Sequence, residues 1–403
     1  MELLRRGTLG ALGDHIDSYA ELLGQQHYSQ TSAYKQLLVI SRFSQWLQRQ
    51  GIEVQKMDED KLQKFLGELS RRIKLKSGDA AALNRLLRLL RQQKIVPEPP
   101  PSPLNSRQRL VAEFARHLLQ ERGLSQATLV NCQPFVDCFL AEQFKNRKVN
   151  LSSLRAADVT SFVQRHAHRF SPGRAKLLVG ALRSFFRYLQ QSGEIPTNLA
   201  ACVPSVPNWS LSALPKFLPA GAVQRVLRHC DRRTSIGRRN YAILLLLARL
   251  GLRACEVVAL NLEDLDWEAG QIRVKGKGGS SSLLPLPADV GEALARYLRN
   301  GRPRCSSRRV FIRAHAPLTG ITSSATISTL VMCALKKAGV NSAPSGAHVF
   351  RHTLATDLLR QGCSLDEIGE LLGHRSPNTT AIYAKVDVTA LHTLALPWPG
   401  GDR

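Results

Sequence analysis

Four side chains in the C-terminal part of the sequence are of types that handle phosphate groups and protons. His348 and Arg351 stand three positions apart, so on a helix both project from one face. His374 and Tyr383 follow, nine positions apart, whereas His352 is expected to turn elsewhere. A guanidinium fork suits an anionic oxygen, and an imidazole exchanges protons near neutral pH. Together these residues indicate chemistry on an anion. Tyr383 is either a nucleophile in that chemistry or a residue of the hydrophobic core.

Two further polar residues open an apolar helical pattern upstream. Arg253 precedes this pattern, and an arginine beside an apolar helix face is costly unless it is paired or faces a ligand. Glu256, three positions later, is placed to orient the arginine from the same face. The alternative is a structural Arg–Glu pair with no further role.

The segment that carries the tyrosine has strong helix start and stop signals. Ser364–Glu367 forms a capping box, and Gly373 is expected to stop the short helix that follows. Ser376 can cap the next helix, with a proline at its first position. These signals predict that His374 lies in a tight turn between two helix ends and that Tyr383 lies two turns into the second helix.

The elements around these residues predict a mainly α-helical block with a small antiparallel β-sheet. Helical patterns cover roughly 220–230, 239–250 and 253–260, and helices are expected again from Val290 to the end. Between them, apolar segments separated by glycine-containing turns predict a three-stranded antiparallel meander. Its strands are expected at Leu265–Trp267, Gln271–Val274 and Ser282–Leu286.

Proline-rich segments divide the chain into three blocks. Residues 96–104 hold five prolines, and because proline is not tolerated inside a helix they predict a stiff linker. A second, proline-punctuated break follows residue 202. The sequence therefore predicts domains at 1–95, 105–202 and 217–403.

The first two blocks resemble each other at an offset of 96–99 residues. A steady offset across three helical elements indicates the duplication of a four-helix unit. The paired positions are Phe43 with Phe139, Phe65 with Phe162, and Arg88 with Arg187.

The composition narrows the classes of partner. The 56 Lys and Arg residues outnumber the 31 Asp and Glu residues, which gives a formal net charge of +25. Such an excess favours a polyanion, because neutralising phosphates releases counterions. No apolar run suits a signal peptide or a membrane span, so a cytoplasmic protein without a membrane role is expected. The eight cysteines include no CxxC pair, which argues for reduced thiols and against a zinc framework.

Four motifs, in this order, resemble those of the tyrosine recombinase (integrase) family: GLRACEVVAL, VKGKGG followed by LLPL, HVFRHTLATDLL and LLGHRSPNTTAIYAK. The resemblance covers the third block, and the second block resembles the family's helical, SAM-like core-binding domain. It implies the tyrosine recombinase catalytic fold, preceded by core-binding-like helical domains of which the first block is a repeat.

The resemblance also implies a set of site residues. Lys277, between Gly276 and Gly278, is the better match to the family's catalytic lysine, and Lys275 is its competitor. Residues 279–282 depart from the family's usual polar turn, which keeps the alternative open. Glu256 matches an acidic residue that supports the site. The implied catalytic residues are Arg253, Lys277, His348, Arg351, His374 and Tyr383.

The reaction that the family resemblance implies takes place on double-stranded DNA and needs no metal ion or cofactor. A tyrosine attacks a phosphodiester and leaves a 3′-phosphotyrosine and a free 5′ hydroxyl. Four protomers on two duplexes would exchange strands through a Holliday junction at a specific site, as a mobile element requires. The tail Val386–Leu396 would dock on a neighbouring protomer. A type IB-like topoisomerase and a catalytically silent DNA-binding regulator are the alternatives.

The N-terminal block adds one expectation to those of the motifs. Its likeness to the second block predicts a DNA-facing surface, and we expect it to contact DNA that flanks or overlaps the core site. A contact between protomers is the alternative. The basic run that carries this expectation consists of Arg71, Arg72, Lys74 and Lys76.

Overall fold

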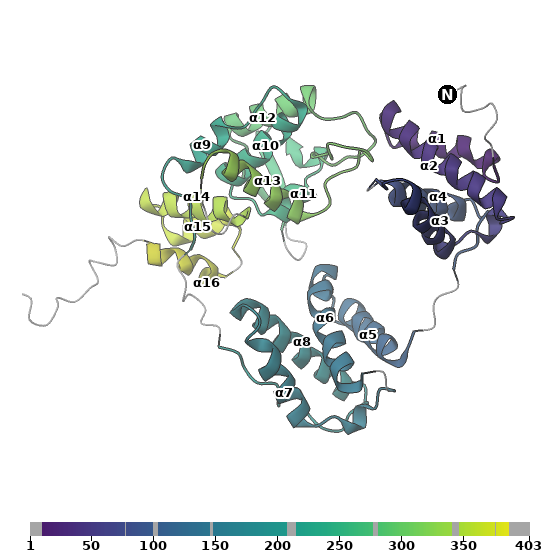
Figure 1. Cartoon of the computed structure of the whole chain (residues 1–403). Coiled ribbons are helices and arrows are strands. Elements are labelled where there is room, and N and C mark those ends of the chain that lie inside the picture. Colours follow the sequence, from purple (N-terminus) through teal and green to yellow (C-terminus); the bar gives the residue numbers. More distant parts are fainter. Residues whose placement is uncertain are drawn as a thin grey trace, which may run out of the picture. The chain divides into compact units, whose positions relative to one another are not determined.

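The computed structural model describes residues 10–76, 78–99, 104–145, 148–207, 215–276, 281–340, 346–374 and 376–386 (Figure 1). Contacts within the chain divide it into two units, Met1–Glu98 with Ala213–Arg403, and Pro99–Ser212. Three large hydrophobic cores form, one from residues 12–96, one from 110–203 and one from 218–350.

The first core is enclosed by four helices: α1 (Gly13–Gln25), α2 (Gln30–Arg49), α3 (Glu59–Arg72) and α4 (Asp79–Gln92). A short 3₁₀ turn, η2 (Val54–Lys56), precedes α3. Polar side chains cap two of these helices, since Ser29 accepts from the Ser32 N–H and Asp58 from the Lys61 N–H. The core centres on Phe43, whose ring lies 5.0 Å from that of Phe65.

The second core is enclosed by a similar set of helices. They are α5 (Ser106–Arg116), which runs on into a π-helical turn η3 (His117–Glu121), α6 (Gln126–Phe144), α7 (Ala156–Ala167) and α8 (Pro172–Gln191), with a 3₁₀ turn η4 (Leu151–Ser153) before α7. Here Phe139 is central, and its ring lies 5.2 Å from that of Phe162. The pair occupies the positions that the sequence comparison aligned with Phe43 and Phe65 of the first core, and the duplication of a four-helix unit stays a prediction.

The third core lies in a helical block that carries the sheet (Figure 1). Its central helix, α10, is buried along the whole run 242–247, because α12 and α14 pack against it. The helices are α9 (Ala222–Arg228), α10 (Ser235–Arg249), α11 (Ala254–Ala259), α12 (Ala288–Asn300), α13 (Ser324–Lys337), α14 (His348–Arg360), α15 (Leu365–Leu372) and α16 (Pro377–Thr380), with 3₁₀ turns η5 (Leu262–Asp264) and η6 (Ala381–Val386).

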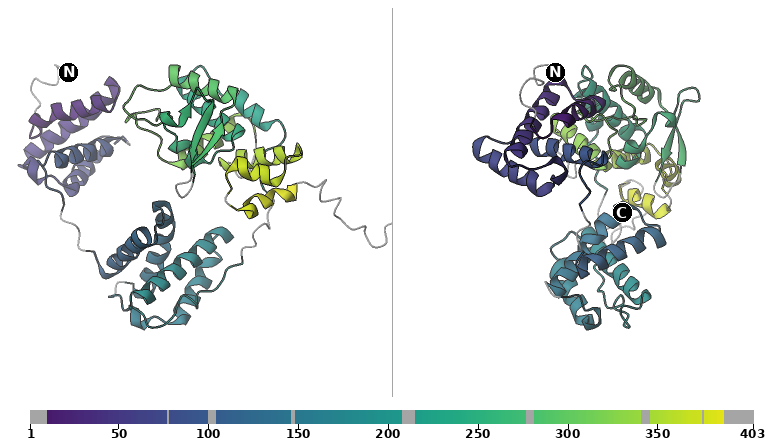
Figure 2. Two further views of the ribbon diagram at one scale, coloured as in Figure 1. Left: turned by 180° about the vertical axis from the view of Figure 1, so that it is seen from behind. Right: turned by 90° about the vertical axis from the view of Figure 1, so that its right-hand side faces the viewer.

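The sheet is the predicted three-stranded antiparallel meander (Figure 2). Its strands are β1 (Leu265–Asp266), β2 (Gln271–Lys275) and β3 (Ser281–Pro285), in the order β1-β2-β3. Ile272 and Val274 alternate into the core, as a half-buried strand requires. The prediction of a mainly α fold with a small antiparallel sheet is confirmed.

One stretch of this block differs from the prediction. The sequence predicts that helices resume from Val290, as α12 to α16 do, but no helix is described between α12 and α13. The stretch runs as irregular chain held by two isolated bridges, Asn261↔Arg309 and Ile312↔Gly320. Its backbone forms hydrogen bonds with residues outside the stretch. For example, the Val310 N–H donates to the Leu260 carbonyl at 2.9 Å. Prolines and glycines here remove the local hydrogen bonds that a helix needs.

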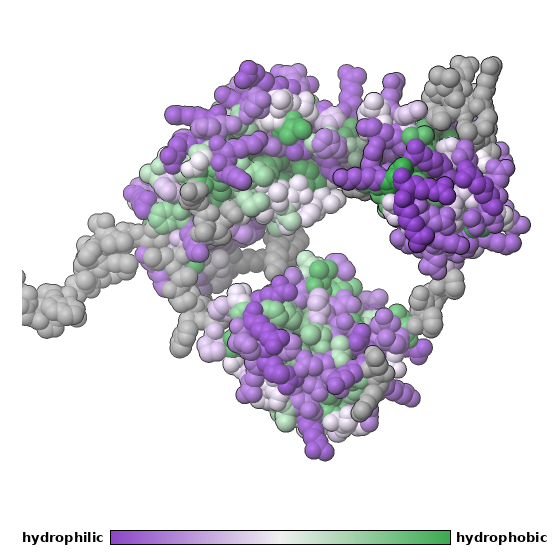
Figure 3. Space-filling view, in the orientation of Figure 1, coloured by the Kyte–Doolittle hydropathy of each residue, from purple (hydrophilic) through white to green (hydrophobic). Residues whose placement is uncertain are grey.

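Polar side chains cover much of each unit's visible face (Figure 3). Within the described ranges, none of the helices has the length and apolar character needed to cross a membrane.

Candidate active site

The first arginine of the site is fixed by the helix it precedes. Arg253 is the N-cap of α11, and its backbone N–H donates to Glu256 Oε2 at 2.8 Å. Its Nη1 donates to Oε1 of the same carboxylate at 2.6 Å. Glu256 is 5% exposed, and a buried carboxylate needs such partners. The pairing predicted from the spacing of Arg253 and Glu256 is therefore present.

The second arginine is held by backbone carbonyls. Arg351 is 5% exposed, and its Nη1 donates to the Gly251 carbonyl at 2.6 Å while its Nη2 donates to the Leu372 carbonyl. Burial, and then the charge of Arg253, lower the pKa of Arg351 to about 10, so it stays charged at neutral pH. A guanidinium has five N–H donors, which leaves three for a ligand.

Gly251 makes the close approach to this arginine possible. Its φ is +60°, in the left-handed region that favours glycine. A Cβ at this position would lie 2.7 Å from Leu372 Cδ2 and 3.1 Å from Leu354 Cδ2. A side chain here would therefore force the Leu372 and Leu354 side chains to shift and would strain the backbone.

The two arginines line one cavity of about 240 Å³. Glu256 and His374 also line it, together with Gly276 and Ser281 at the β2–β3 ends. The cavity therefore combines two fixed cations with an imidazole, a set of donors suited to the oxygens of a phosphate.

His374 lies in the predicted turn. Gly373 ends α15 in the left-handed conformation, with φ +59°, as its position predicted. The His374 ring is fixed through Nδ1, which lies 2.8 Å from the hydroxyl oxygen of the buried Thr380. Burial, followed by the charges of Arg351 and Arg253, lowers the pKa of His374 to about 4, so the ring is neutral at pH 7.

Tyr383 is buried, with 1% of its surface exposed. It was expected two turns into an α-helix, but α16 ends at Thr380 and the tyrosine lies in the 3₁₀ helix η6. Ser376 is the N-cap of α16, yet its side chain makes no capping hydrogen bond. A helix of four residues without a side-chain cap gains little free energy from further α-helical turns. Side-chain packing therefore determines the backbone conformation around Tyr383.

The hydroxyl of Tyr383 lies 2.9 Å from Nδ1 of His352. This contact corrects the expectation that His352 points away from the site. The signal was present in the sequence, because His348 and His352 are four positions apart and share one helix face. Their ring centroids lie 6.4 Å apart; His352 is partly buried, whereas His348 is exposed.

Of the two candidate lysines of the β2–β3 hairpin, one lies in the described residues. Lys277 lies outside the described residues. Lys275, its competitor, has its ammonium nitrogen 3.4 Å from Oδ1 of the buried Asp264. Its side chain is 53% exposed, and the ion pair ties it to the chain before β1.

Two other predictions concern the C-terminal tail and the N-terminal basic run. Beyond Val386 the predicted docking tail lies outside the described residues. Of the N-terminal basic run, Arg71 and Arg72 form the last turn of α3, and all four side chains are exposed.

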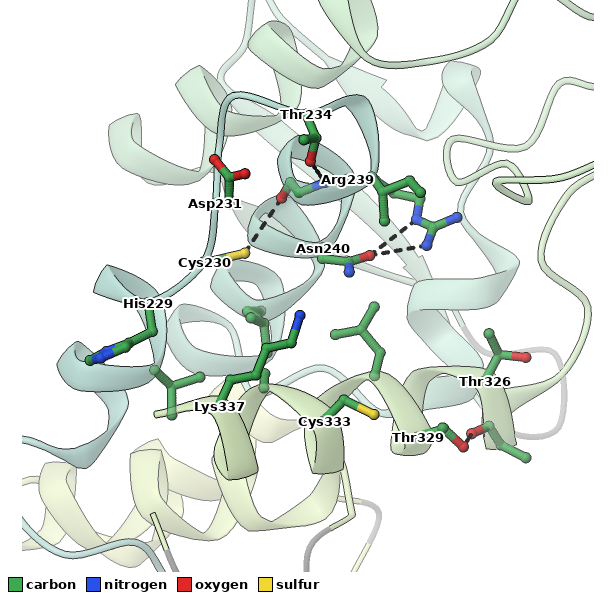
Figure 4. Close-up of a pocket in the computed structure, with 17 residues that line it drawn as sticks. His229, Cys230, Asp231, Thr234, Arg239, Asn240, Thr326, Thr329, Cys333 and Lys337 are labelled. Atoms are coloured by element: carbon green, nitrogen blue, oxygen red, sulfur yellow. Dashed lines mark hydrogen bonds between the residues drawn. The ribbon is translucent and has the colours of Figure 1, made fainter. Parts of the chain in front are cut away.

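A larger cavity of about 660 Å³ lies between α9, α10 and α13 (Figure 4). None of the predicted site residues lines it. Its most buried cation, Arg239, is bonded to the Ile312 carbonyl at 2.9 Å and to Asn240 Oδ1 at 3.1 Å. Among the residues with described positions, no group of three His, Cys, Asp or Glu side chains could hold a metal ion.

Known proteins match this chain in sequence and in fold. The model of the phage integrase family matches residues 216–389. The integrase/recombinase y4rA of Sinorhizobium fredii is 47% identical over 402 residues, 98% of this chain and 97% of the relative. The tyrosine recombinase XerD of Listeria monocytogenes is 30% identical over 69% of this chain and 94% of the relative. A lambda integrase tetramer bound to a Holliday junction shares the fold, with a TM-score of 0.54 and 17% identity over 75% of this chain and 86% of that one.

These matches define a DNA-binding recombinase. The chain belongs to the tyrosine recombinase family, as its four motifs predicted.

Proposed function

We propose that this protein cuts and rejoins DNA at a specific site, with Tyr383 as the nucleophile. The observation that carries the proposal is the burial of Tyr383 beside His374, whose ring stacks on that of Tyr383 at 6.5 Å and lines the cavity of the two arginines. Burial raises the pKa of the Tyr383 hydroxyl, and the charges of Arg351 and Arg253 oppose this rise. A tyrosine that served packing alone would have no need of the charges of two arginines acting on its hydroxyl.

The arginines stabilise the phosphate during attack. Arg351 and Arg253 donate to the two non-bridging oxygens, whose negative charge grows in the pentacoordinate transition state. Because both guanidinium groups are held by carbonyls or by Glu256, little reorganisation is needed when the DNA binds. His374, fixed through Nδ1, has Nε2 free to donate to one of these oxygens.

The leaving group needs a proton from another residue. The 5′ oxygen of DNA is a poor leaving group at neutral pH, so a lysine on the β2–β3 hairpin protonates it. Lys277 takes this role, since the Lys275 ammonium group is engaged by Asp264.

Rejoining to a second duplex completes recombination. Attack by Tyr383 conserves the bond energy in a 3′-phosphotyrosine, and the 5′ hydroxyl of the partner duplex then displaces the tyrosine. Four protomers hold the two duplexes, coupled by the tail after Val386, and the strands exchange through a Holliday junction. The fold shared with the lambda integrase tetramer on such a junction supports this assembly, and a mobile element is its proposed setting.

The test uses Tyr383→Phe on a nicked suicide substrate. The variant should bind the site with wild-type affinity and form no covalent adduct on a denaturing gel. Because Tyr383→Phe removes one hydroxyl, its melting temperature should change little. An adduct that persists in the variant would disprove the assignment. Wild-type protein should also join strands from two duplexes, which separates a recombinase from a topoisomerase.

The N-terminal block forms a second part of the proposal. It contacts DNA next to the core site through the exposed basic residues at the end of α3. Removing residues 1–100 should shorten the footprint of one bound protomer and flatten the salt dependence of binding, because fewer counterions are released. An unchanged footprint and salt slope, with only assembly lost, would instead make the block a protomer contact.

A further inference from the structure

The reacting hydroxyl of Tyr383 has a histidine partner that the family motifs did not single out. Nδ1 of His352 lies 2.9 Å from the Tyr383 oxygen, within the range required of a general base. The ring centroids lie 5.7 Å apart. The His352 side chain therefore touches the atom that attacks DNA in the proposed function.

The surroundings of His352 favour a neutral ring. The titratable groups around it are His348 and Arg351 on α14, His374 in the turn after α15, and Tyr383 in η6. Burial first, and then His348 and Arg351, lower the pKa of His352. At neutral pH the ring carries one proton, which leaves one nitrogen free to accept another.

We propose that His352 accepts the Tyr383 proton during cleavage and returns it during rejoining. This inference rests on the proposed function, because it takes Tyr383 as the nucleophile.

The proton balance of the step is simple. As the tyrosine O–P bond forms and the bond to the 5′ oxygen breaks, the O–H bond breaks and its proton moves to Nδ1 of His352. The 5′ oxygen takes a different proton, from the hairpin. In rejoining, the tyrosine is the leaving group and the same imidazolium protonates it. His352 therefore acts in both directions on one oxygen.

A structural role for the same hydrogen bond is the competing explanation, since a buried tyrosine hydroxyl needs a partner. The two roles differ in what can replace the imidazole. An asparagine oxygen can accept a hydrogen bond in the place of Nδ1, but it cannot hold the proton. His352→Asn therefore keeps the structural role and removes the chemical one.

The first experiment measures single-turnover cleavage and rejoining by full-length His352→Asn. General base catalysis contributes about 10²–10⁴-fold, so both rates should fall by at least about 100-fold. The melting temperature and the affinity for the site should match those of the wild type. His229→Asn is the control for replacing a histidine, because His229 follows the end of α9 and lines the larger cavity, which holds none of the predicted site residues. Cleavage by His352→Asn within threefold of wild type, or faster than wild type, would overturn the inference.

The substrate and the pH separate this step from protonation of the leaving group. A 5′ bridging sulfur leaves without a proton and should not rescue His352→Asn. Alkaline pH should partly restore its cleavage, because hydroxide then removes the tyrosine proton. Rescue by sulfur, or a rate ratio to wild type that does not change with pH, would contradict the inference.

The second experiment determines the tautomer of His352 by nitrogen NMR on histidine-labelled protein. The inference requires Nε2–H and an unprotonated Nδ1, with the Nδ1 signal shifting in Tyr383→Phe. A proton on Nδ1 in the wild type would disprove it. If Tyr383→Phe still forms the adduct, the proposed function itself fails. If that variant is inactive and His352→Asn is fully active, only the role of His352 is lost.

Discussion

The candidate site has two halves that are held in place by different forces. The arginine half consists of Arg253, Glu256 and Arg351, and each is fixed by charged or backbone hydrogen bonds in buried surroundings. The tyrosine half is the segment 365–386, where Tyr383 makes one side-chain hydrogen bond and packs in a small apolar cluster.

The difference teaches which parts of the site also stabilise the fold. In the arginine half, removing a side chain leaves buried polar groups without partners, so function and stability change together. In the tyrosine half, the reacting hydroxyl can be removed while the ring stays packed. Variants of the two halves should therefore separate in a plot of activity against stability.

The largest combined effect on activity and stability is expected for Arg351→Ala. The variant should cleave at least about 10²–10³-fold more slowly, because a donor to the transition state is lost. It should also be destabilised by roughly 2–6 kcal/mol, since the Gly251 and Leu372 carbonyls each lose a buried partner worth about 1–3 kcal/mol. Cleavage assays and urea denaturation measure the two effects. Stability equal to that of Tyr383→Phe would remove the distinction between the halves.

A pair of lysine variants tests the edge of the arginine half. Lys277→Ala should cleave about 10²–10⁴-fold more slowly and recover with a 5′ bridging sulfur, which leaves without a proton. Lys275→Ala should lose its ion pair with the buried Asp264, at some cost in stability, and keep most activity. Sulfur rescue of Lys275→Ala in place of Lys277→Ala would exchange the two assignments.

The smallest expected effect is a loss of stability on acidification, which we attribute to His374 in the tyrosine half. The pKa of His374 is lowered to about 4 by burial and by Arg351 and Arg253, whereas in an unfolded chain histidine titrates near about 6.5. At pH values between about 4 and 6.5 the unfolded state binds more protons at His374 than the folded state does. The contribution of His374 to stability is therefore complete above about pH 6.5 and is lost as the pH falls toward about 4. Arg351 stays charged throughout.

Melting curves at pH 7 and pH 5 measure this effect. His374→Asn should show a smaller difference between the two temperatures than wild type does, because one titrating group is gone. An equal difference in both proteins would show that His374 does not carry the acid sensitivity.

Local signals in the sequence predicted much of this structure. Strand alternation located the sheet to within one or two residues, and the serine and glycine signals located α15 and its stop. The spacing of Arg253 and Glu256 was enough to predict their contact. The catalytic roles stay predictions, and so does the role of Lys277.

Features that depend on distant contacts were not predicted. The stretch between α12 and α13 takes its backbone partners from Leu260 and Asn261, some fifty residues earlier. The 3₁₀ conformation around Tyr383 and its contact with His352 depend on how η6 packs against α14. Helix propensity and capping describe only neighbours in the chain, so they cannot identify such partners.

The small hydrophobic cluster that includes Tyr383 also bears on how easily the segment 365–386 opens. Its fully buried members, Ala355, Ile368, Leu372 and Tyr383, form a cluster separate from the main core around α10. Opening the segment 365–386 exposes less apolar surface than unfolding the block, so it costs less free energy. We therefore expect backbone amides of α15 and η6 to exchange with deuterium through local opening, and those of α10 to exchange only on global unfolding. Tyr383, the proposed nucleophile, would then lie on a part of the block that opens without unfolding the rest.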